Sequence, residues 1–195
     1  MSLHHIYDSN AQVEPLADNL WSVSNCFGPE TFERLSRAHT SYEDTWHRHS
    51  DCLEYRLQLA PQSPTLLAMT EIGNAMLPQI EQITGVELAR AECKLWLDLS
   101  GWHCPYHYDD PMLVVTYQVF LWQHGDVHGT EFVYGPEVPK DQWHNHKLFE
   151  NHTKVATKFT PNTGYINRNT DLKIHYCPNI SGTRLSAAWQ FRRKV

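Results

Sequence analysis

The chain has 195 residues, of which 41% are hydrophobic and 12% aromatic, and this composition is typical of a globular protein rather than a disordered chain. Its net charge of −6 disfavours a protein that grips nucleic acid across a broad surface. No apolar stretch approaches the roughly 20 residues of a membrane-spanning helix. We therefore expect one domain over residues 1–195, with neither nucleic acid nor a membrane as its partner.

The N-terminal residues and the cysteines indicate a cytoplasmic protein. Residues 1–23 lack the basic start and apolar run of a secretory signal. The five cysteines are odd in number and form no CxxC pair, which favours free thiols in a reducing compartment. The 13 histidines make metal-like spacings frequent by chance, so a metal site must rest on more than histidine density.

Residues 63–84 carry the clearest helical pattern of the first half of the chain. Ser63 suits the N-cap, Pro64 the first helical position, and Gly85 the C-terminal end. Pro78 lies inside this pattern and predicts a kink, because it lacks the N–H that would bond to the preceding turn. Apolar residues recur at helical spacing, namely Met69, Ile72, Met76, Ile80 and Ile83.

A shorter helix is predicted over residues 30–39 and a short strand over residues 54–59, so we expect residues 1–85 to form a mostly helical N-terminal support. After residue 85 the sequence pattern changes to short β-prone segments separated by residues typical of turns. These segments are residues 86–99, 112–122, 130–134, 154–160, 164–168, 171–177 and 184–191. The order predicts a mainly β fold, with a barrel-like or sandwich core over residues 86–192 and the N-terminal helices packed on its outer face.

The last of these strands has two unlike faces. Leu185, Ala187, Trp189 and Phe191 share an apolar face that the predicted helix over 63–84 can cover. Arg184 shares the other face with Ser186, Ala188 and Gln190, so it is expected to point into the barrel. A buried guanidinium needs an anionic partner, which is either a distant Asp or Glu or a ligand carboxylate.

The segment HYD at 107–109 offers a candidate metal site. His107 and Asp109 are two residues apart, so on an extended segment both side chains leave the same face. His175 is the best third ligand. Two imidazoles and one carboxylate on one side of a metal leave open positions on the other, as in non-haem Fe(II) oxygenases. Turn residues 178–182 allow the chain to reverse, which is expected to bring His175 and Arg184 to one cavity from neighbouring strands.

The ordered set HYD, His175 and SGTRLS resembles the Fe(II)/2-oxoglutarate-dependent dioxygenases, whose pattern is HxD, a distal His and then an Arg about one strand later. The strand TYQVFLW, the GTEF segment and FTPNTGYIN further resemble the prolyl-hydroxylase-like branch. The resemblance covers roughly residues 90–192. It implies a double-stranded β-helix, also called a jelly roll or cupin-like fold.

The resemblance also implies the roles of individual residues. His107, Asp109 and His175 would bind Fe(II), and Arg184 would pair with the distal carboxylate of 2-oxoglutarate. Ser186 matches the RxS arrangement of part of the superfamily. Phe120 stands where the family often has a tyrosine that contacts the cosubstrate, and Gln118, on the same face, is the candidate to replace that contact.

The implied reaction consumes O2 and 2-oxoglutarate, releases succinate and CO2, and hydroxylates a C–H bond of a peptidyl residue or a small metabolite. The carboxylate of Asp109 favours hydroxylation, because the related halogenases lack it. Nucleic-acid demethylation fits less well, since Gln190 stands where the repair enzymes have a second arginine.

The alternatives are a non-catalytic β-barrel binding module and a cupin-like zinc site. Several further polar residues are expected to have no part in a metal site. Asp110 is expected in a turn, and the pairs His47/His49 and His144/His146 are expected at the surface. His103 is four residues before His107, but nearby glycine and proline argue against a helical metal pair. Neither the substrate nor the oligomeric state follows from the sequence.

Overall fold

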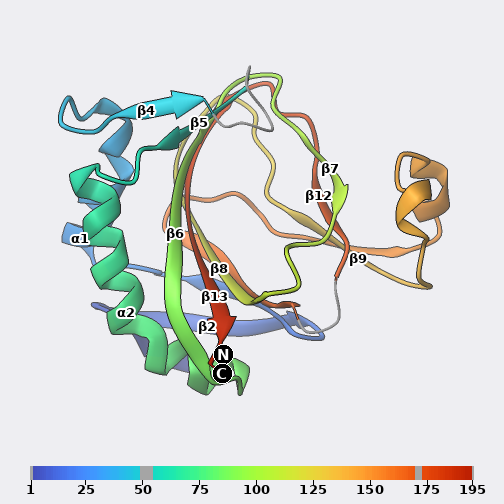
Figure 1. Cartoon of the computed structure of the whole chain (residues 1–195), viewed down its shortest axis with the longest axis horizontal. Helices are drawn as coiled ribbons and strands as arrows, with labels where there is room; N and C mark the ends of the chain where they lie inside the picture. The colour runs from blue at the N-terminus through green and yellow to red at the C-terminus, as the bar shows by residue number, and fades with distance from the viewer. Residues whose placement is uncertain (1, 49–54, 170–172, 195) are drawn as a thin grey trace.

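The computed structural model describes residues 2–48, 55–169 and 173–194, and these residues form two antiparallel β-sheets that face each other (Figure 1). The nine-stranded sheet has the order β1-β2-β3-β11-β8-β13-β6-β5-β4. In that order its strands are Ser2–Ile6, Ser9–Ala17, Leu20–Ser24, Thr163–Arg168, Leu113–His124, Thr183–Arg193, Leu88–Asp98, Arg56–Leu59 and Trp46–Arg48.

The four-stranded sheet has the order β10-β9-β12-β7. Its strands are Thr153–Ala156, Glu131–Tyr134, His175–Cys177 and Cys104–His107. The expected double-stranded β-helix is confirmed, since consecutive segments of the chain pass between the two opposed sheets. The helices are α1 (Pro29–Ser36) and α2 (Pro64–Thr84), with 3-10 turns η1 (Ala38–Thr40), η2 (Lys140–Gln142) and η3 (His146–Phe149).

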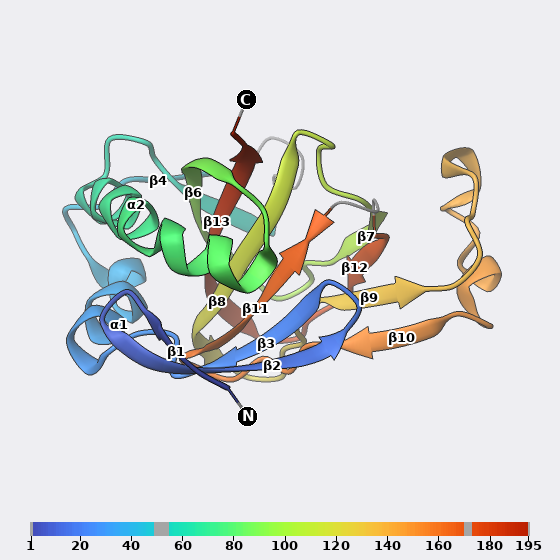
Figure 2. The same ribbon diagram turned by 90° about the horizontal axis from the view of Figure 1, so that it is seen from below.

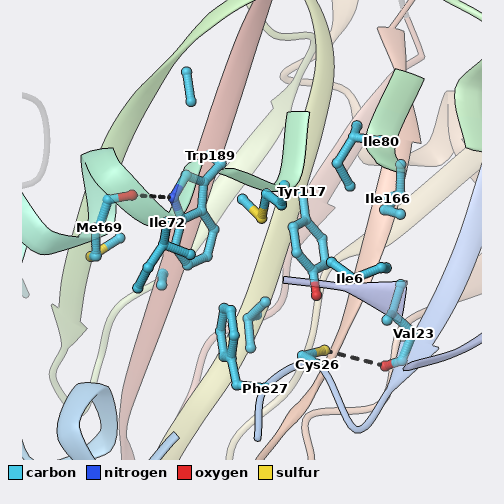
Figure 3. Packing of buried hydrophobic residues seen from close by; sticks show 14 of the residues in the cluster. Ile6, Val23, Cys26, Phe27, Met69, Ile72, Ile80, Tyr117, Ile166 and Trp189 are labelled. Carbon is cyan, nitrogen blue, oxygen red and sulfur yellow. Dashed lines mark hydrogen bonds between the residues drawn. The ribbon is translucent and has the colours of Figure 1, made fainter. Parts of the chain in front are cut away.

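Helix α2 covers the outer face of the larger sheet, as its apolar spacing predicts (Figures 1 and 2). The apolar face of β13 packs against it, and the Nε1 of Trp189 donates a hydrogen bond to the carbonyl of Met69 at 2.8 Å (Figure 3). The helix continues through Pro78 to Thr84. Gly85 ends it with φ 68, a left-handed conformation that glycine adopts without steric cost.

The N-terminal segment differs from its prediction. Residues 1–85 were expected to be mostly helical, but the chain opens with β1, β2 and β3, which extend the larger sheet (Figure 2). Strand β3 pairs with β11, from Thr163 opposite Ser24 to Asn167 opposite Leu20. A half-buried strand of five residues has a weak local signal, and its partner lies far along the chain. The pairing is therefore decided by tertiary structure rather than by local pattern.

No helix in the described part of the chain is long and apolar enough to cross a membrane.

Candidate metal centre

His107, Asp109 and His175 come together at the facing ends of β7 and β12. His107 closes β7 and lies directly opposite His175, the first residue of β12. Their ring centroids are 4.2 Å apart, and the Nε2 of His175 lies 3.7 Å from Oδ1 of Asp109. Each residue offers one ligand atom, and these three atoms lie within 4.8 Å of one another. One ion at their centre can contact all three.

Backbone carbonyls orient both imidazole rings. The Nδ1 of His107 lies 2.9 Å from the carbonyl oxygen of Pro105, and the Nδ1 of His175 lies 3.1 Å from that of Lys173. A carbonyl only accepts, so each Nδ1 must carry the proton and each Nε2 keeps its lone pair. This is the arrangement in which a histidine presents Nε2 to a metal while its other nitrogen is held by the protein.

Two neighbouring side chains orient the carboxylate of Asp109. Its Oδ2 accepts hydrogen bonds from the hydroxyl of Thr116 at 3.2 Å and from the amide of Asn169 at 3.1 Å. The same amide donates to Thr116 at 3.2 Å, so the three groups form a closed network. Oδ1 is thereby directed towards His175, and the donor set of two imidazole nitrogens and one carboxylate oxygen suits Fe(II).

His175 is held in its neutral form. Burial, together with the like charge of His107, lowers the pKa of His175 from 6.5 to about 4. A neutral imidazole is the form that binds metal, so at neutral pH this ring needs no deprotonation to act as a ligand.

Arg184 points into the barrel, as its strand face predicts, and its protein partner is Asp98. The Nε of Arg184 donates to Oδ2 of Asp98 at 2.9 Å, and its Nη1 donates to the carbonyl of His128. Asp98 also accepts two hydrogen bonds from Arg56, at 2.5 and 3.1 Å. Asp98 lies in register between Arg56 on β5 and Arg184 on β13, so three adjacent strands present one row of charges.

Indole rings hold this row in place. The guanidinium carbon of Arg56 lies 4.1 Å from the ring centroid of Trp102 and 4.5 Å from that of Trp96. The guanidinium of Arg184 lies 4.5 Å from the same Trp102 ring. Guanidinium groups stack well on aromatic faces, which fixes their planes. Asp98 is 0% exposed and Arg184 1%, so the row belongs to the interior of the barrel.

One cavity of about 80 Å³ joins the triad to the two arginines. Its wall also includes Gln118, Thr130, Tyr165 and Gln190. Gln118 faces the cavity, but its Oε1 accepts a hydrogen bond from the hydroxyl of Tyr165 at 2.7 Å. A phenol thus lines the same cavity as the two arginines. It comes from β11, whereas the resemblance implies a tyrosine on β8.

Two neighbouring positions contribute less to this cavity. Phe120 packs in an apolar cluster, with its ring 4.4 Å from that of Phe159. Ser186 is fully buried, is not part of the cavity wall, and its hydroxyl has no hydrogen-bond partner among the described residues. Asp110, His103, His47, His144 and His146 are all exposed, and His49 lies outside the described residues.

One detail of the predicted arrangement is wrong. His175 and Arg184 were expected on neighbouring strands, but β12 belongs to the smaller sheet and β13 to the larger one. The turn between them carries the chain from one sheet across to the other. The two side chains therefore face the same cavity from opposite walls.

Sequence reasoning missed several residues of this site, among them Arg56, Asp98, Thr116 and Asn169. Each lies at an inward-facing strand position or directly after a strand, and each is an ordinary polar residue. One indication of them lay in the sequence: the inward-facing Arg184 needs an anionic partner, and its own strand has no acidic residue. No local pattern identified Asp98 as that partner.

No family model and no curated protein matches the sequence. Solved structures do match in fold. A Pseudomonas putida prolyl-4-hydroxylase has a TM-score of 0.62 at 13% identity, over 91% of this chain and 94% of its own. HygX from Streptomyces hygroscopicus, solved with nickel, 2-oxoglutarate and hygromycin B, has a TM-score of 0.65 at 10% identity, over 90% and 83%.

A Trichoplax adhaerens prolyl hydroxylase, solved with a peptide fragment of the oxygen degradation domain of hypoxia inducible factor, has a TM-score of 0.64 at 10% identity, over 91% and 84% of the two chains. The chain therefore has the fold of the 2-oxoglutarate oxygenases, prolyl hydroxylases included. At these identities the likeness concerns fold alone.

Proposed function

We propose that this protein is an Fe(II)/2-oxoglutarate-dependent oxygenase that hydroxylates a C–H bond of a small molecule or a peptidyl residue. The carrying observation is the set of His107, Asp109 and His175, whose ligand atoms lie within 4.8 Å of one another and are oriented by the surrounding backbone and side chains. A jelly-roll fold hosts many functions, so the proposal rests on this site rather than on fold alone.

Bound Fe(II) and 2-oxoglutarate would supply the oxidising chemistry, with O2 as the oxidant and succinate and CO2 as products. The chain supplies positions and charge. His107, Asp109 and His175 would hold the metal, and Arg184, with Arg56 beside it, would offer guanidinium donors to the distal carboxylate of the cosubstrate. Asp98 fixes the orientation of both guanidiniums.

Anaerobic titration with Fe(II) and 2-oxoglutarate tests this proposal. We expect a weak visible charge-transfer band that requires both additions, followed in air by succinate release in a panel of candidate substrates. His175→Ala removes one of three ligands and is expected to abolish both signals. His103→Ala is the matched control, because His103 is an exposed histidine close to the site in sequence.

A zinc-binding or non-catalytic barrel would behave differently. In either case Fe(II) would produce no band that depends on 2-oxoglutarate, and that result would overturn the proposal. Full succinate release by the His175→Ala variant would contradict the ligand assignment.

A further inference from the structure

Gln190 is a buried residue of β13 whose side-chain oxygen has no hydrogen-bond partner. The residue is 6% exposed and belongs to the wall of the cavity of about 80 Å³ that all three candidate metal ligands also line. Its Oε1 accepts no hydrogen bond from any described residue. Of the buried atoms in the described part of the chain that lack a partner, only this oxygen and the Nε1 of Trp102 belong to that wall. A buried acceptor without a partner costs folding free energy, so this oxygen indicates a ligand that supplies the donor.

Strand register places Gln190 at the metal end of this cavity. Gln190 lies directly opposite Thr116 on β8, whose hydroxyl donates to Oδ2 of Asp109 at 3.2 Å. The Cβ atoms of such in-register pairs are roughly 5 Å apart. Arg184 shares the inward face of β13 but lies six residues away, which corresponds to roughly 20 Å of extended chain. Gln190 therefore lies beside the metal ligands, whereas Arg184 lies at the far end of the cavity.

The inward face of β13 is closed at Arg184 and reaches solvent just beyond Gln190. Arg184 is 1% exposed, whereas the side chain of Arg192, two residues after Gln190, is 45% exposed. Arg192 pairs at 3.7 Å with Glu92, an exposed residue of β6 that lies opposite Gln190. A molecule that enters from solvent along this face meets Gln190 as the first buried side chain of the cavity wall.

The donor that this oxygen needs does not come from 2-oxoglutarate, because ionised carboxylates and keto oxygens accept hydrogen bonds and donate none. We propose that the Oε1 of Gln190 binds the substrate, and that the substrate presents an N–H or an O–H close to the metal. An analogue without that donor would leave the oxygen buried and unpaired, which makes Gln190 a specificity-determining residue. The inference rests on the proposed function, and it names a chemical feature of the substrate of the same site.

Three ligands with one five-membered ring test the donor preference: 2-pyrrolidinone with an N–H, cyclopentanol with an O–H, and cyclopentanone with neither. Dissociation constants are measured by ligand-observed NMR on the metal-free full chain, with saturating glutarate present to occupy the arginine end of the cavity. We expect at least one of the two donors to bind about fivefold more tightly than cyclopentanone, which is the effect of one hydrogen bond. The tighter of the two donors identifies the group that the site takes.

Variants locate the preference at Gln190. In Gln190→Met the three ligands are expected to bind equally, whereas Gln142→Met, at an exposed position of η2, keeps the original ratio. Gln190→Met also removes an unpaired acceptor, so the urea midpoint of the metal-free protein is expected to stay equal or rise. Gln118→Met is the matched comparison for stability, because its Oε1 already accepts a hydrogen bond from Tyr165, and its urea midpoint is expected to fall.

The inference is overturned if cyclopentanone binds as tightly as both donors, if Gln190→Met keeps the preference, or if its urea midpoint falls as that of Gln118→Met does. A weaker anaerobic affinity of Gln190→Met for 2-oxoglutarate would assign the residue to the cosubstrate and overturn it too. The NMR and urea measurements contain no metal. A normal Fe(II)/2-oxoglutarate band without the donor preference therefore contradicts this inference alone, whereas the donor preference without that band contradicts the oxygenase proposal and leaves the Gln190 site standing.

Discussion

Asp98 carries a buried charge that two arginines share. Its carboxylate accepts hydrogen bonds from Arg56 and Arg184, and it has no exposed surface. Removing one partner from a buried ionic group costs more than the interaction itself contributes, because the remaining charges stay buried without compensation. The row of Arg56, Asp98 and Arg184 is therefore expected to act as one unit in stability.

Asp98→Asn should lower the free energy of unfolding by about 3–5 kcal/mol, since it leaves two guanidiniums beside a neutral amide in the interior. Urea denaturation measures this loss. Asp141→Asn, at an exposed position of η2, is the matched control and should change stability by less than about 0.5 kcal/mol. Equal effects of the two substitutions would mean that the row contributes little to folding.

The proposed pairing of Arg184 with the distal carboxylate of 2-oxoglutarate can be tested by comparing keto acids with and without that carboxylate. Arg184→Lys keeps the charge but loses the planar fork, so the anaerobic affinity for 2-oxoglutarate is expected to fall about tenfold. Affinity for 2-oxobutanoate, which lacks the distal carboxylate, should change little. Arg56→Lys tests the second guanidinium in the same way. A parallel loss for both keto acids would indicate distortion of the cavity instead.

At the scale of elements, the contact between α2 and β13 depends on a small residue. A Cβ added at Gly73 would lie 2.6 Å from Cδ1 of Trp189 and 2.9 Å from the Cβ of Ala91. Glycine is a poor helix former, so its place in the middle of α2 reflects this close approach rather than local preference. The indole of Trp189 is held by the carbonyl of Met69, which limits its movement.

Gly73→Ala is accordingly expected to destabilise the protein by about 1–3 kcal/mol, although alanine favours the helix. Asn74→Ala, at the adjacent exposed position, gains the propensity without the clash and should be neutral or slightly stabilising. Thermal or urea unfolding of the pair gives the comparison. A stabilised Gly73→Ala variant would show that the helix can move away from β13 at little cost.

At the scale of the whole molecule, the metal-free protein should lose stability in mild acid. The pKa of His175 is lowered by burial to about 4 in the folded protein, against 6.5 ordinarily. Below pH 6.5 the His175 imidazole binds a proton in the unfolded chain, whereas in the folded chain it stays neutral until about pH 4. The free energy of unfolding therefore falls as pH drops through this window, by on the order of 1–3 kcal/mol.

Urea titrations between pH 7 and pH 4 measure this slope in the metal-free protein. His175→Gln has no group to titrate at this position and should show a shallower slope, whereas His103→Gln should keep the slope of the unmodified protein. Identical slopes in all three proteins would assign the acid sensitivity to other groups.

The sequence by itself determined which side chains could meet. His107 and Asp109 share a face because their spacing of two matches the alternation of an extended chain, and the same alternation directed Arg184 inward. Helix α2 followed from apolar residues at helical spacing. These are local rules, in which each residue constrains its near neighbours, and they sufficed for the β-prone segments, the covering helix and the pair of His107 and Asp109. The jelly-roll fold and the full ligand set with His175 were implied by the ordered motif of the family resemblance.

Tertiary structure decided the rest. Strands β1 to β3, the placement of His175 and Arg184 on opposed sheets, and the pairing of both arginines with Asp98 all depend on which strands lie side by side. Strand pairing joins residues that are remote in sequence, and its free energy comes from burial and register across the whole sheet. No local pattern carries that information, so the charged row and the cavity that it lines emerge only from the folded chain.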